Sequence, residues 1–89
     1  MQKPMIHLNG DTAETLADLN FDALQRVTDA MEAIMKATPN ARNFYPIGPD
    51  AYPTARAEHV ARLESLAKVA ADLSAIAEHC VDHIRNKTA

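Results

Sequence analysis

Residues 38–53 read TPNARNFYPIGPDAYP, and they separate two long stretches that have a helical pattern. Four of the five prolines and three of the four aromatic residues of the chain lie in this segment. On both sides of it, apolar residues recur every three or four positions, which is the period of an amphipathic helix. The pattern therefore predicts two helices joined by a stiff, aromatic connector.

The first helix is expected over residues 11–37. Asp11 or Thr12 is a suitable N-cap, and Asp11 with Glu14 resembles a capping box. Pro39 ends the helix, because the residue before a proline is disfavoured in the α region. The apolar face of this helix comprises Leu16, Leu19, Ala23, Leu24, Val27, Met31, Ile34 and Met35. On the polar face, Asp22–Arg26 and Glu32–Lys36 have the spacing of helical ion pairs.

The second helix is expected over residues 51–86, after a loop at 38–50. Asp50 suits the N-cap, and Pro53 then falls in the first turn, where its missing N–H costs nothing. Its apolar face comprises Leu63, Leu66, Ala70, Leu73, Ala77, Cys80 and Ile84. Residues 1–10 form an extended lead-in, expected to lie across a helix face.

The 89 residues form a single small domain whose own core is marginal. Two antiparallel helices do not surround a core, and each apolar face is wider than one partner helix covers. We therefore expect an all-α fold: an antiparallel helical hairpin with a long proline-rich and aromatic connector, assembled as a homo-oligomeric helical bundle.

Composition limits the classes of partner. The net charge of −3 argues against generic nucleic-acid binding, which requires a basic surface. No apolar run approaches the ~20 residues of a membrane span, so we expect no membrane association. The N-terminus has no apolar stretch of signal-peptide length. The single cysteine forms no internal disulfide and fits a reducing compartment, so a cytoplasmic protein is expected.

The connector carries the candidate ligand-binding residues, which are Arg42, Phe44, Tyr45, Tyr52 and Arg56. Rings on a proline-stiffened backbone offer stacking faces, and arginines make bidentate contacts to phosphate or carboxylate. These groups suit a planar anionic ligand such as a nucleotide. Two alternatives stay open: Phe44 and Tyr52 plug the end of the hairpin while Arg42 pairs with an acid, or the connector is a protein-binding epitope.

The other reactive side chains have simpler interpretations. His79 and His83 have the i,i+4 spacing of metal ligands, but a closed site needs about four ligands and no matching pair is present, so no metal or cofactor is expected. His59 is expected to be buried and hydrogen-bonded, and Cys80 to be a core residue. No nucleophile–base or paired-carboxylate constellation can be assembled, so we expect no enzyme.

Three segments resemble a known group of proteins. Residues 39–46 (PNARNFYP), Gly48 and residues 58–63 (EHVARL) are similar to a pattern in short uncharacterised helical proteins of tailed phages and prophages. The lead-in residues 6–10 (IHLNG) also resemble it, so the likeness spans most of the chain.

The chain departs from this pattern at two positions. Asn43 and Phe44 stand where the pattern usually has Asp and Tyr, and any capping or ligating role of that Asp would be lost here. The resemblance implies a phage accessory protein in the host cytoplasm. Small phage proteins of this kind counter host defences by sequestering a nucleotide signal or by blocking a host protein. The expected function is thus binding of an anionic, nucleotide-like ligand, or alternatively docking on a host or virion protein.

Overall fold

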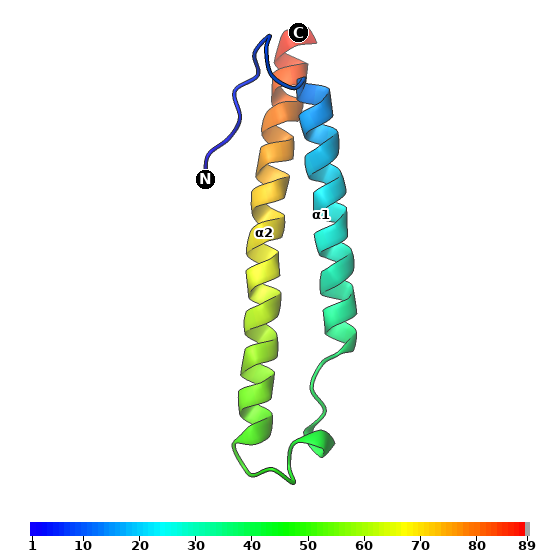
Figure 1. The fold of residues 1–89 in the computed structure, drawn as a ribbon, viewed down its shortest axis with the longest axis vertical. Coiled ribbons are helices and arrows are strands. Elements are labelled where there is room, and N and C mark those ends of the chain that lie inside the picture. The colour runs from blue at the N-terminus through cyan, green and yellow to red at the C-terminus, as the bar shows by residue number, and fades with distance from the viewer. Residues whose placement is uncertain (89) are drawn as a thin grey trace.

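The computed structural model describes residues 1–88 as a hairpin of two antiparallel α-helices (Figure 1). Helix α1 spans Ala13–Lys36 and helix α2 spans Ala51–Thr88, with a short 3₁₀ turn, η1, at Ala41–Asn43 between them. No strand occurs among these residues. The predicted all-α helical hairpin is therefore confirmed.

Helix α1 is capped by Thr12 and begins at Ala13, two residues later than expected. The backbone of Thr12 is extended, and its hydroxyl oxygen accepts from the N–H of Thr15 at 3.1 Å. The predicted capping box of Asp11 and Glu14 is therefore wrong. The reason is local, since the Thr12 carbonyl already accepts the first helical bond, from Leu16 at 3.0 Å, which makes Thr12 the N-cap.

The connector is held by its own backbone. The side chain of Asn40 accepts from the N–H of Arg42 at 3.0 Å and starts η1, and the N–H of Ile47 then bonds to the carbonyl of Phe44 at 3.0 Å. Gly48 has φ +156°, a backbone conformation that residues with a side chain rarely adopt. The carbonyl of Asp50 accepts from Thr54 at 3.1 Å, so Asp50 occupies the N-cap position of α2.

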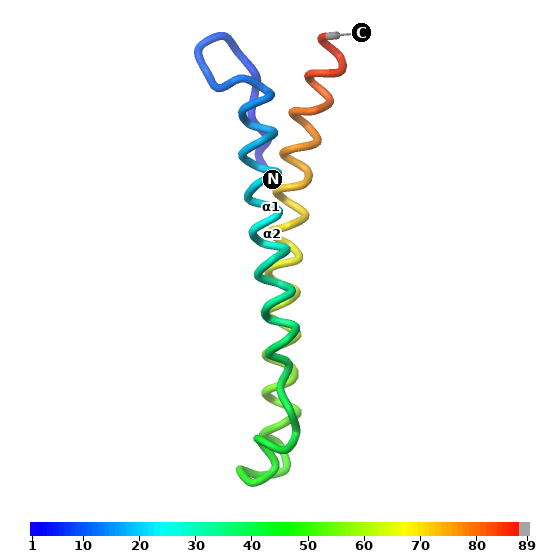
Figure 2. Tube along the Cα trace, turned by 90° about the vertical axis from the view of Figure 1, so that its right-hand side faces the viewer, coloured from blue at the N-terminus to red at the C-terminus, as the bar shows by residue number. Residues whose placement is uncertain are grey.

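Small side chains bring the two helices together near their free ends. Ala13 and Ala17 of α1 pack with Cys80 of α2, and all three are buried. Half-buried neighbours surround this contact, namely Ile6, Leu16, Val81 and Ile84. Figures 1 and 2 together show two inclined helices in a thin rod, whose extents are 62 × 22 × 20 Å. The interior of the hairpin is therefore narrow.

The N-terminal lead-in lies beside the far end of α2 and then turns into α1 (Figure 1). The Nε2 of His79 donates to the carbonyl of Pro4 at 2.8 Å, and Ile6 packs against the Ala13–Cys80 contact. A turn follows, in which the N–H of Gly10 bonds to the carbonyl of His7 at 3.2 Å. The lead-in covers a helix face, as predicted.

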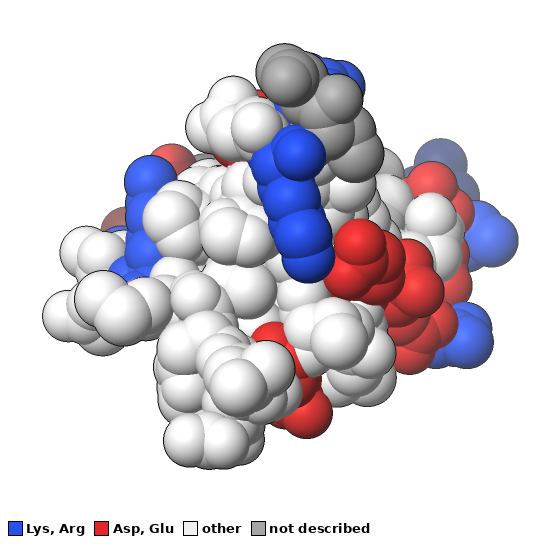
Figure 3. Space-filling view, turned by 90° about the horizontal axis from the view of Figure 1, so that it is seen from above, with Lys and Arg blue, Asp and Glu red and all other residues white. Residues whose placement is uncertain are grey.

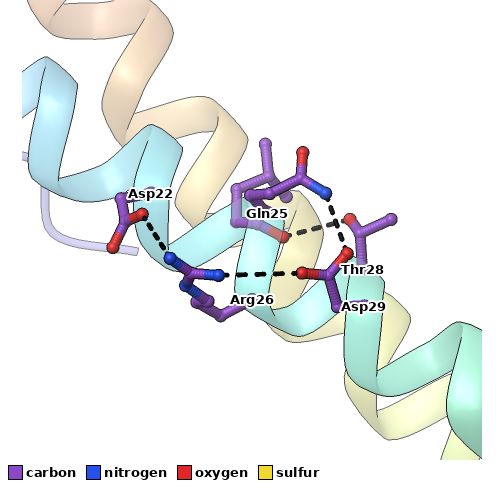
Figure 4. A network of polar contacts seen from close by, with 6 residues as sticks. Asp22, Gln25, Arg26, Thr28 and Asp29 are labelled. Atoms are coloured by element: carbon purple, nitrogen blue, oxygen red, sulfur yellow. Dashed lines mark hydrogen bonds and ion pairs between the residues drawn. The ribbon is translucent and has the colours of Figure 1, made fainter.

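The outer face of α1 carries a polar network (Figure 4). Arg26 lies 3.5 Å from Asp22 and 4.0 Å from Asp29, and Gln25 donates to Asp29 at 2.9 Å. The predicted Asp22–Arg26 pair is thus present, whereas Glu32 and Lys36 form no ion pair among residues 1–88. These exposed pairs add at most about 1 kcal/mol each.

Within residues 1–88, no helix has an apolar stretch of the length that a membrane span requires.

Gly48 gives a test of the connector. Replacing it with Ala should lower the free energy of unfolding by about 1–2 kcal/mol, because an L residue is strained at this φ. The added Cβ meets no atom within 4 Å, so the cost comes from the backbone alone. Urea unfolding followed by circular dichroism measures it. Ile47→Ala, at an exposed neighbour, is the control and should change stability by under about 0.5 kcal/mol. Equal stability of both variants would contradict the strained turn.

Candidate functional site

The aromatic and arginine residues of the connector region are split between two places. Tyr52 and Arg56 are one helical turn apart at the start of α2, and with Pro53, Ala57 and Val60 they line a hollow of about 500 Å³. Arg42, Phe44 and Tyr45 do not line it. The structure therefore joins two of the five candidate residues in one hollow.

The other three candidates belong to the 3₁₀ turn and the bend after it. Arg42 is exposed within η1, Phe44 is half-buried, and the side chain of Tyr45 is 73% exposed. The N–H groups of Phe44 and Tyr45 both bond to the carbonyl of Ala41 at 3.0 Å. This tight turn fixes the backbone at both residues, and neither side chain lines the hollow.

The hollow provides one guanidinium and one phenol ring over an apolar floor. Such a pair can hold one anionic group by a bidentate contact and stack against a planar one. It has a single cation, Arg56, where two were expected to converge. The hollow therefore brings together fewer polar groups than the five-residue site predicted from the sequence.

His59 fastens the connector to the helices. Its side chain is 7% exposed, and its Nε2 lies 3.3 Å from the hydroxyl oxygen of Thr38, just beyond the end of α1. The single hydroxyl proton of Thr38 is donated to the carbonyl of Met35. His59 must therefore donate to Thr38 from Nε2. The predicted buried, hydrogen-bonded histidine is confirmed, with a structural role.

The two histidines near the end of α2, His79 and His83, have different surroundings. His79 holds the lead-in through the carbonyl of Pro4, while His83 lines a separate cavity at the free end of the hairpin. Within residues 1–88, no three His, Cys, Asp or Glu side chains are grouped to hold a metal ion. The i,i+4 spacing here places the two rings in different surroundings.

Cys80 is fully buried against α1, which confirms the prediction of a core residue. Burial raises the pKa of its thiol, because the charged thiolate loses solvation in this environment. The side chain is therefore held in the form that is unreactive toward electrophiles.

Sequence reasoning missed a cavity of about 720 Å³ at the open end of the hairpin, where the two helices carry the chain termini. Residues 6–8 of the lead-in, the start of α1 and the last turns of α2 form its walls. Figure 3 looks down on this end, where side chains other than Lys, Arg, Asp and Glu cover most of the surface. A basic side chain lies across them, with acidic side chains beside it. The His7–Gly10 turn beside a capped helix was the available signal, but only the fold brings the end of α2 to it.

No protein-family model, curated protein or solved structure matches this chain. The resemblance to phage proteins stays a prediction. The case for function therefore rests on the geometry of the hairpin.

The chemistry of Cys80 provides a test of the packing at the helix contact. In the native protein the thiol should react with a disulfide reagent at least about tenfold more slowly than in urea. The thiol of Cys80 has a higher pKa in the folded chain than in the unfolded chain. Its contribution to stability is therefore complete below about pH 8.5 and is lost at higher pH, where the unfolded chain ionises first. A Cys80→Ala variant should lack that loss. Native and unfolded chains reacting at equal rates would contradict the buried contact.

Proposed function

We propose that this chain is a non-enzymatic binding protein that works as a homo-oligomer: hairpins pack into a helical bundle, and the exposed connector docks on another protein. The observation that carries this proposal is the mismatch between the large apolar surface of the hairpin and its small core. The same mismatch supplies the driving force for association.

The surface area of the hairpin exceeds that of a compact monomer. A globular protein of 9.7 kDa exposes about 5,100 Å², whereas this chain exposes 6667 Å². Its radius of gyration is 19.1 Å, compared with about 12 Å for a compact chain of this length. The excess of about 1,500 Å² is of the order that one subunit buries against its neighbours in a stable assembly.

Large apolar side chains contribute to this excess surface. Among the described residues, the buried apolar side chains are Ala13, Ala17, Ala77 and Cys80. Large apolar side chains stay exposed along both helices, including Leu19, Phe21, Met35, Val60 and Val69. Because each is already about half-buried, complete burial would contribute roughly half of the ~1.5–3 kcal/mol that a fully exposed side chain gains. A second hairpin is a partner that covers such a length of helix.

Helix α1 has a second apolar stripe beside the one that faces α2. One line of α1 packs on α2 through Ala13 and Ala17. The same line continues along the helix with Asn20 and Leu24. The second stripe lies on one flank of that line and repeats at intervals of three and four residues. Leu16, Ala23, Val27 and Ile34 are half-buried there, and Leu19 and Ala30 are exposed. This spacing presents one continuous face along the helix. A helix from another subunit would pack there.

The connector is the surface proposed for another protein. Tyr45 and Ile47 are 73% and 74% exposed at the closed end of the rod, with the exposed Arg42 nearby in sequence. Exposed tyrosine and arginine side chains are frequent anchors of protein interfaces. In the setting implied by the phage resemblance, the partner is a host or virion protein in the host cytoplasm.

A second candidate function is binding of an anionic, nucleotide-like ligand. The hollow of Tyr52 and Arg56 favours it, because a ring and a guanidinium share one concave surface there. A neighbouring subunit in the bundle would supply further contacts. The separation of Arg42, Phe44 and Tyr45 from the hollow ranks this candidate below protein docking.

Concentration-dependent stability tests the assembly. If folding and association are coupled, mass action should stabilise the assembly by a free energy on the order of RT ln of the concentration ratio. The melting temperature should therefore rise as protein concentration increases from about 1 to about 100 μM. Leu19→Glu places a charge in the second stripe and should abolish this rise by favouring single hairpins. Ile47→Glu, on the connector, is the control and should keep it. A melting temperature independent of concentration in the unsubstituted chain contradicts the proposal.

Thermal shift measurements separate the two candidate functions. A cyclic or linear nucleotide present at 100 times its dissociation constant would stabilise the protein by about 2.7 kcal/mol. If the hollow is the site, Arg56→Ala and Tyr52→Ala should remove the shift, whereas Arg42→Ala should leave it. Capture of one host protein that Tyr45→Ala and Ile47→Ala prevent, without any nucleotide shift, supports docking instead. A nucleotide shift that Arg56→Ala leaves unchanged excludes the hollow.

A further inference from the structure

The cavity at the open end is built from three separate parts of the chain. The lead-in contributes Ile6, His7 and Leu8, the beginning of α1 contributes Ala13 and its neighbours, and the end of α2 contributes Ile84 and Lys87. At about 720 Å³, its volume falls within the range usual for small-molecule sites. It lies at the opposite end of the rod from the connector, so it is independent of the docking surface proposed there.

The floor of the cavity is apolar. Ala13 is buried, and Ile6 and Ile84 are half-buried where they pack against the Ala13–Cys80 contact. Leu8 stands at the mouth with its side chain 99% exposed. An alkyl chain lying on this floor would cover apolar surface that the hairpin itself leaves open to water.

The charged groups stand at the rim. His7, His83 and Lys87 are exposed side chains that carry or can accept a proton, and Glu14 is the one acidic side chain among the cavity walls. An ammonium and two imidazoles provide donors for an anionic head group. Lys87 and Glu14 carry opposite formal charges, and the two imidazoles add N–H groups, so the rim offers an anionic head group several donors.

The wall formed by the lead-in is fixed by two contacts. The hydrogen bond between His79 and Pro4 ties the lead-in to α2, and the Gly10–His7 bond closes the turn. A Cβ at Gly10 would lie 3.0 Å from Nε2 of His7, so the absence of a side chain at this position lets the ring fold back over the turn. The ring of His7 thus lies close to Gly10, beside the cavity.

We propose that this cavity binds an amphipathic carboxylate. Its alkyl chain lies on Ile6, Ala13 and Ile84, and its carboxylate is held at the rim by Lys87 with His7 and His83. The site combines an apolar floor with N–H donors at the rim, and it takes a ligand with an alkyl chain and a hydrogen-bond-accepting head group.

Nuclear magnetic resonance titration tests the proposal with octanoate as the probe. Octanoate should shift the backbone amide signals of residues 6–14 and 83–87 and leave those of the connector unchanged. Octylammonium and octanol have the same alkyl chain, but the first is a cation and the second is neutral. Both should therefore bind at least about threefold more weakly. Equal binding of all three probes, or shifts spread over Leu19 and Val69 on the outer faces, would overturn it.

Charge variants test the rim. Lys87→Gln should weaken octanoate binding about three- to fivefold, and Glu14→Gln should strengthen it by a similar factor, because one removes an attraction and the other a repulsion. Lys68→Gln, at an exposed position midway along α2, is the matched control and should have no effect. Gly10→Ala should weaken binding by displacing His7. Circular dichroism checks that each variant folds, and unchanged affinity in folded Lys87→Gln and Glu14→Gln proteins would refute the assignment.

Discussion

The packing of Ala13 and Ala17 on Cys80 is the contact on which the rest of the structure depends. Small side chains let the helices approach closely, but they bury little area, so the hairpin gains little stability from its interior. Several large apolar side chains, including Leu19, Phe21 and Val69, stay exposed on the outer faces. The narrow interior and the exposed apolar side chains thus have one cause, and together they are the basis of the proposed association.

Two histidines of α2 each hydrogen-bond to a segment outside the helices, one at each end of the rod. His59 donates to Thr38 and ties the connector to α2 at the closed end, while His79 donates to Pro4 and ties the lead-in to α2 at the open end. Each bond spans a large separation in sequence and positions a segment without regular helix. The proposed docking surface and the proposed carboxylate site each lie next to one of these attachments, so local order at both ends follows from α2.

Much of the fold could be predicted because its signals are local and periodic. The prolines of the connector and the three–four spacing of apolar residues determine two helices, and the positions of His59 and Cys80 on the apolar line of α2 determine their burial. The N-cap was less certain, because Asp11 and Thr12 both suit it and only backbone geometry selects Thr12. The separation of Phe44 and Tyr45 from the hollow arises in the folded connector, and the open-end cavity depends on bringing residues 6–14 to residues 83–87. Neither has a periodic signature.

The central claim is that one hairpin does not complete its own core. A native mass spectrum of the protein at micromolar concentration, taken without denaturant, tests this most directly. The account predicts assemblies whose masses are integer multiples of the 9.7 kDa chain. It also predicts that Leu19→Glu, on the second stripe of α1, reduces them to single chains. A spectrum of the unsubstituted protein that contains only the 9.7 kDa species would contradict the account.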